Sequence, residues 1–100
     1  MKIVLMEPLG IDGVTLDRLA ETLTEQGHEF SAYDTFSTDV EELKRRSSGA
    51  DVLIIANHPL PGEVIRADAN LKFISVAFVG IDHVDVEACR EQNVRISNTG

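Results

Sequence analysis

Residues that could bind a small anion follow one apolar run in the second half of the sequence. The segment SVAFVGIDHVD, residues 75–85, carries small and apolar residues up to Val79, then Gly80, and then two aspartates. A glycine lets the backbone approach a ligand, and a turn after a strand can direct successive N–H groups, here those of Val79, Gly80 and Ile81, at one anion. We therefore interpret this turn as a candidate carboxylate-binding site.

A purely structural interpretation of the same segment stays open. Gly80 would then only end a strand, Asp82 would hold the turn through its side chain, and Asp85 would cap the following helix. Both aspartates have these structural uses in either interpretation, so the binding hypothesis depends on the backbone around Gly80.

A second group of polar residues lies in NHPLPG, residues 57–62. The amide of Asn57 both donates and accepts hydrogen bonds, and the imidazole of His58 can exchange a proton near neutral pH. Pro59 and Pro61 restrict the backbone, so these polar groups would be held in place. The loop is either the edge of a binding site or a solvated turn.

The other residues with reactive side chains are assigned no chemistry. His28 and His83 have no partner at metal-ligand spacing and are interpreted as surface residues, so no metal site is predicted. Cys89 shares a helical face with Val86, which favours packing in the core over a role as a nucleophile.

Two kinds of segment alternate along the chain. Short apolar runs rich in β-branched residues predict strands at 2–6, 28–34, 51–56, 72–78 and 94–98. Helical periodicity and capping residues predict helices within 12–27, 37–49, 62–68 and 85–93, with Val14, Leu16, Leu19, Ala20 and Leu23 forming the apolar stripe of the first. Ser37 or Thr38 is the expected N-cap of the second helix, and Gly27 the C-terminal cap of the first.

This alternation predicts one domain, residues 1–100, with a five-stranded parallel sheet and helices on both faces. The commonest small arrangement is the flavodoxin-like strand order 2-1-3-4-5, which places the second and fifth strands at the edges. Ligands of such sheets bind beyond the carboxyl ends of the strands, where both NHPLPG and the Gly80 turn are expected.

The composition of the chain argues against nucleic acid and membranes as partners. Nine basic and 17 acidic residues give a formal charge of −8, which disfavours nucleic acid and anionic membranes. A single cysteine fits a reducing cytoplasmic setting, and no apolar run is long enough to span a membrane.

Three functions that similar folds perform lack their residues in this chain. A phosphoacceptor domain would need an aspartate at the end of the third strand, where Ala56 and Asn57 stand. A flavin-phosphate loop would need hydroxyl groups, and EPLGIDG, residues 7–13, has none. The dinucleotide fingerprint G-x-G-x-x-G is missing from the sequence.

The second half of the chain resembles the D-isomer-specific 2-hydroxyacid dehydrogenases. The resemblance spans residues 50–100, through ADVLIIANHPLPGEVI and LKFISVAFVGIDHVDVEACREQNVRISNTG, and its most specific part is FVGIDHVDVEACREQNVRISN. It implies a substrate-binding domain of an enzyme that interconverts a D-2-hydroxy acid and a 2-oxo acid with NAD or NADP. The full-length enzyme would be a homodimer.

The resemblance also assigns roles to individual residues. Val79 and Gly80 would bind the substrate carboxylate through backbone N–H groups, Phe78 would form a wall of the pocket, and Asn57 and His58 would lie at its rim. It implies that the cofactor-binding domain and all catalytic residues follow Gly100, so residues 1–100 alone should be inactive. The alternative is a stand-alone flavodoxin-like binding module without catalysis.

Overall fold

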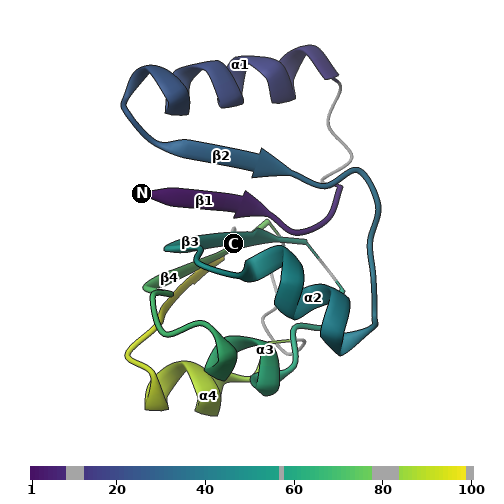
Figure 1. Cartoon of the computed structure of the whole chain (residues 1–100), viewed down its shortest axis with the longest axis vertical. Helices are drawn as coiled ribbons and strands as arrows, with labels where there is room; N and C mark the ends of the chain where they lie inside the picture. The colour runs from purple at the N-terminus through teal and green to yellow at the C-terminus, as the bar shows by residue number, and fades with distance from the viewer. Residues whose placement is uncertain (9–12, 57, 78–83, 99–100) are drawn as a thin grey trace.

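A computed structural model of residues 1–100 describes the whole chain apart from residues 9–12, 57, 78–83 and 99–100. Its centre is a sheet of five parallel strands in the order β2-β1-β3-β4-β5, which confirms the predicted order (Figure 1). The strands are β1 (Lys2–Leu5), β2 (Glu29–Ala32), β3 (Val52–Ile55), β4 (Phe73–Val76) and β5 (Arg95–Asn98).

In the described residues, four helices connect these strands. They are α1 (Gly13–Glu25), α2 (Val40–Ser47), α3 (Gly62–Ala67) and α4 (Val86–Glu91). Each follows one strand and precedes the next, as the apolar patterns predicted. In Figure 1, α1 lies beside β2, whereas α2, α3 and α4 lie together at the opposite end of the view.

The core forms between one face of the sheet and three of the helices. Its strand members are Val4, Leu53, Ile55, Ile74 and Val76, which the parallel register aligns across the sheet. Its helix members are Leu43 of α2, Val64 and Ile65 of α3, and Ala88 and Cys89 of α4. Alternate residues of a strand face the same side, so this one face binds all three helices.

Two helices begin and end as their residue types require. Gly27, just after α1, has φ +86°, the left-handed conformation predicted for a C-terminal cap. Asp85 caps α4, because its side chain accepts a hydrogen bond from the N–H of Ala88 at 3.0 Å. The predicted capping roles of both residues are confirmed.

One other expectation, the N-cap of α2, needs correction. The N-cap of α2 is Asp39, whose carboxylate accepts from the N–H of Glu42, whereas Ser37 accepts a hydrogen bond from the N–H of Asp39 and Thr38 has no capping role. The predicted apolar stripe of α1 is partly covered: Leu16, Leu19, Ala20 and Leu23 are half-buried, whereas Val14 is 64% exposed.

Candidate functional site

The described part of the site lies where β1 and β3 end. The two strands are adjacent, and the N–H of Met6 donates to the backbone oxygen of Ile54 at 2.9 Å, so their carboxyl ends stay together. Glu7 follows β1 and His58 follows β3, which brings two residues 51 positions apart in the sequence into contact.

Glu7 is a buried carboxylate that binds the loop after β3. Its side chain is 4% exposed. Its Oε1 accepts from the N–H of Ala56 at 2.6 Å and from the N–H of His58 at 3.3 Å, and its Oε2 contacts Nδ1 of His58. A buried carboxylate is stable only when hydrogen-bonded in this way, so Glu7 fixes the start of the loop.

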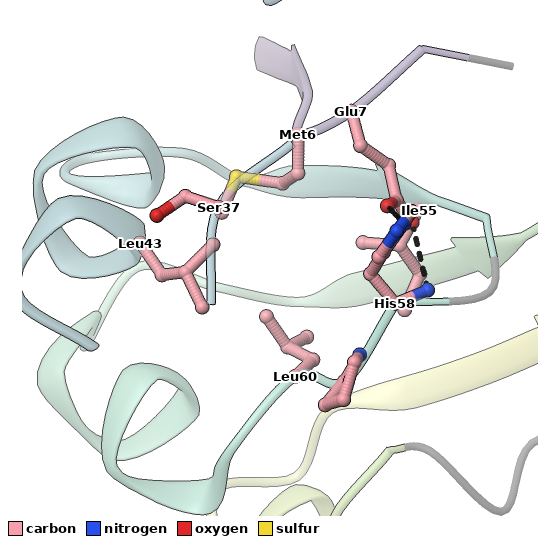
Figure 2. A pocket seen from close by; sticks show the side chains of 8 residues that line it. Met6, Glu7, Ser37, Leu43, Ile55, His58 and Leu60 are labelled. Atoms are coloured by element: carbon pink, nitrogen blue, oxygen red, sulfur yellow. Dashed lines mark hydrogen bonds and ion pairs between the residues drawn. The ribbon is translucent and has the colours of Figure 1, made fainter. Parts of the chain in front are cut away.

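The imidazole of His58 is held on its face as well as its edge. The ring of Phe36 stacks on it with a centroid distance of 4.1 Å and an interplanar angle of 14°. Figure 2 shows His58 directed toward Glu7 among the residues that line a small hollow. The residues that line this hollow are Met6, Glu7, Ser37, Leu43, Ile55, His58, Pro59 and Leu60.

Arg46 of α2 fixes the segments that carry Glu7 and Phe36. Its Nη1 donates to the backbone oxygens of Met6 at 3.2 Å and Thr35 at 2.6 Å, the residues just before Glu7 and Phe36. Its side chain is 7% exposed. The guanidinium therefore supports both groups that hold His58.

The loop after β4 starts and ends next to the loop after β3. At its start, the N–H of Ala77 donates to the backbone oxygen of Ile55 at 2.8 Å. At its end, Val84 forms an isolated parallel bridge with Leu60. The described residues on either side of the second candidate loop, Ala77 and Val84, are therefore anchored beside the segment that carries the first.

Gly62 permits close contact between the starts of α3 and α4. A Cβ atom at this position would collide with Oδ2 of Asp85 and would lie 3.0 Å from Nη1 of Arg66. The first residue of α3 and the N-cap of α4 therefore pack against each other. This contact fixes the spacing of the two helices, each of which follows one candidate loop.

Of the predicted site residues, the structure places only His58. Asn57, Phe78, Val79 and Gly80 lie outside the described residues, so their proposed roles remain predictions. Sequence reasoning missed Glu7. The signal for it was an acidic residue directly after a strongly apolar strand, at the same sheet edge as NHPLPG.

The described residues provide hydrogen-bonding groups and offer no covalent or redox chemistry. Cys89 is 1% exposed, and burial, with a smaller contribution from Asp85, raises the pKa of its thiol, which confirms its assignment to the core. Within the described ranges, no three His, Cys, Asp or Glu side chains gather at a possible metal site. Among the helices that the structure describes, none has the length and apolar content needed to cross a membrane.

Comparison with known proteins shows the family. The model of the D-isomer specific 2-hydroxyacid dehydrogenase catalytic domain matches residues 3–100. A hydroxypyruvate reductase of Blautia hydrogenotrophica is 31% identical over 104 residues, which cover 98% of this chain and 30% of the relative.

Solved structures agree in fold. An NAD⁺-bound 3-phosphoglycerate dehydrogenase of Entamoeba histolytica superposes with a TM-score of 0.80 at 28% identity, covering 99% of this chain and 32% of that one. An NAD-dependent formate dehydrogenase of Staphylococcus aureus gives a TM-score of 0.77 at 33% identity, covering 98% and 32%. The chain therefore spans about a third of the length of the proteins it matches.

Proposed function

The chain belongs to the D-isomer-specific 2-hydroxyacid dehydrogenase family, and from this we propose that it is the substrate-binding domain of an enzyme that interconverts a 2-hydroxy acid and a 2-oxo acid. The observation that carries the proposal is the family match over residues 3–100 together with the anchoring of Ala77 and Val84, on either side of the second candidate loop, beside the segment that carries the first, at the carboxyl edge of the sheet. Ligands of open parallel sheets bind at that edge.

In this proposal the loop after β4 binds the acid. The N–H groups of Val79 and Gly80 donate hydrogen bonds to its carboxylate, and Phe78 covers its carbon chain. Asn57 and His58 lie at the rim of the pocket, and the hydrogen bond that the N–H of His58 donates to Glu7 supports the placement of His58. Binding the carboxylate fixes the orientation of the carbon that reacts.

The proposal includes a nicotinamide cofactor, NAD or NADP, held by a separate domain. Hydride transfer needs a cofactor because no protein side chain supplies a hydride. Two neighbours at 28% and 33% identity are described as NAD-bound or NAD-dependent, which supports this class of cofactor. We place the dinucleotide-binding domain and the catalytic residues beyond Gly100, in a cytoplasmic homodimer, so residues 1–100 alone should not turn over substrate.

A glycine substitution tests the carboxylate-binding role. In the enzyme that carries this domain, Gly80→Ala should raise the KM for a 2-oxo acid about tenfold or more, because the new Cβ obstructs the approach of the acid to the backbone. Gly13→Ala is the matched control, since nothing lies within 4 Å of a Cβ built at Gly13. Oxidation of NADH or NADPH, followed by absorbance, gives the KM.

The outcomes separate the hypotheses. An unchanged KM in Gly80→Ala contradicts the assigned carboxylate site. Absence of turnover with any 2-oxo acid in the intact protein favours the alternative, a binding module that has lost catalysis. Turnover by residues 1–100 alone contradicts the proposal that the catalytic residues lie in a separate domain.

A further inference from the structure

The Glu7 carboxylate contacts both the backbone N–H and the imidazole ring of His58. Its Oε1 is occupied by the two backbone N–H groups of Ala56 and His58, and only Oε2 faces the imidazole. We infer that Glu7 is the positioning residue of the loop after β3: it holds the proton of neutral His58 on Nδ1 and leaves Nε2 as a hydrogen-bond acceptor for a ligand.

The chemistry of the partners sets this tautomer. An ionised carboxylate only accepts hydrogen bonds, so the ring nitrogen that contacts it must carry a proton. His28 provides the opposite case in the same chain. Its Nδ1 lies 3.1 Å from the N-terminal ammonium of Met1, which only donates, so Nδ1 of His28 must accept and its proton must sit on Nε2. While the N-terminal amine is protonated, the two histidines are therefore expected to be opposite tautomers.

The ring of His58 is also fixed in orientation. Phe36 covers one face at a centroid distance of 4.1 Å, and Glu7 holds the Nδ1 edge. The side chain of His58 remains 35% exposed, and among the described residues no hydrogen-bond partner meets Nε2. Nε2 can thus accept a hydrogen bond from the hydroxyl group of a bound 2-hydroxy acid, a step that rests on the proposed function.

Long-range ¹H–¹⁵N correlation spectra of the imidazoles test the tautomer directly. We expect protonated Nδ1 and unprotonated Nε2 for His58 at about pH 8.5, two units above the ordinary imidazole pKa. An unprotonated Nδ1 in His58 overturns the inference, and this wild-type measurement decides the point without any variant.

Glu7→Gln should reverse the tautomer of His58. Two backbone N–H groups meet Oε1, so the carbonyl oxygen of the glutamine must face them and its NH₂ group must face Nδ1. An amide N–H donates, which moves the ring proton to Nε2. Glu21→Gln, on the exposed surface of α1, is the control and should leave both histidines unchanged. A folded Glu7→Gln protein in which His58 keeps the Nδ1–H tautomer contradicts the assigned role.

Titration with D-lactate tests the role of Nε2 in binding. Because a carbonyl oxygen only accepts hydrogen bonds, whereas a hydroxyl group both donates and accepts, reversal of the tautomer should favour the 2-oxo counterpart, pyruvate. The ratio of the Kd of D-lactate to the Kd of pyruvate should therefore rise about fivefold or more in Glu7→Gln over wild type and Glu21→Gln. Reversal of the tautomer with an unchanged ratio of the two Kd values overturns the ligand contact of Nε2. If wild type binds neither this pair nor any other 2-hydroxy or 2-oxo acid, the proposed function fails, while the spectra still decide the role of Glu7.

Discussion

Replacing Arg46 by methionine removes the guanidinium that joins three segments next to the candidate site. Arg46 donates to the backbone oxygens of Met6 and Thr35, to Oγ1 of Thr35 at 3.0 Å, and through Nε to Glu42 at 2.8 Å. Its guanidinium carbon also lies 4.5 Å from the centroid of the Tyr33 ring. Methionine retains an apolar stem of similar length, so the change removes mainly the charge and its donors.

The burial of Arg46 sets the size of the effect. At 7% exposure, water cannot fully replace the lost donors. Leaving one buried carbonyl without a partner costs about 1–3 kcal/mol, and breaking a buried ion pair costs about 3–5 kcal/mol. In Arg46→Met, Glu42 keeps a second partner in Arg45. The expected loss in the free energy of unfolding therefore lies near the lower end of the range for a broken ion pair, at about 3 kcal/mol.

Urea unfolding followed by circular dichroism measures this loss. With a denaturant dependence of about 1.5 kcal/mol per molar, the midpoint of Arg46→Met should fall by about 2 M. Arg45→Met is the matched control: its side chain is 69% exposed and binds the same Glu42, so its midpoint should hardly move. Equal midpoints for the two variants, or a shift below about 0.5 M in Arg46→Met, would refute the reasoning.

Three further predictions follow from single contacts. Gly62→Ala should lower the melting temperature, because its Cβ would collide with Oδ2 of Asp85, and a normal melting curve would count against this packing. Cys89 should resist thiol reagents in the folded protein and react after unfolding, since it is buried and its pKa is raised; rapid labelling of the native protein would contradict this. The hydrogen bond from the N–H of Lys2 lowers the pKa of Asp51, with a further contribution from Lys72. The stabilisation from ionised Asp51 is present above the ordinary pKa of 3.8 and is lost as the pH falls through the lowered pKa. The difference in stability between wild type and Asp51→Asn should therefore disappear in acid. A difference that does not depend on pH would contradict this linkage.

The sequence was sufficient for the parts of the fold that depend on local pattern. Apolar runs such as residues 51–56 gave the strands, and Gly27 and Asp85 gave two helix caps, because backbone conformation and capping depend on neighbouring residues. The predicted N-cap of α2, Ser37 or Thr38, was wrong, because the cap is Asp39, the next residue. Ser, Thr and Asp can all cap a helix, so the sequence did not distinguish among these three neighbours.

The contacts around His58 could not be predicted in the same way. His58 was selected from its loop, but its partner Glu7 lies 51 positions away and its stacking partner Phe36 follows β2. Such contacts depend on which strands are neighbours and on their register. Once the order β2-β1-β3 is known, the proximity of Glu7 to His58 follows from the sheet, which is why the strand order is the necessary intermediate.

The central claim is that the backbone after β4 binds the carboxylate of a small acid. An amide ¹H–¹⁵N shift titration of the protein with pyruvate, and with methyl pyruvate as the uncharged control, tests it most directly. We predict saturable shifts at Val79, Gly80 and Ile81 with pyruvate and no comparable shifts with the ester. Equal responses to both compounds, or pyruvate-induced shifts confined to residues elsewhere in the chain, would contradict the claim.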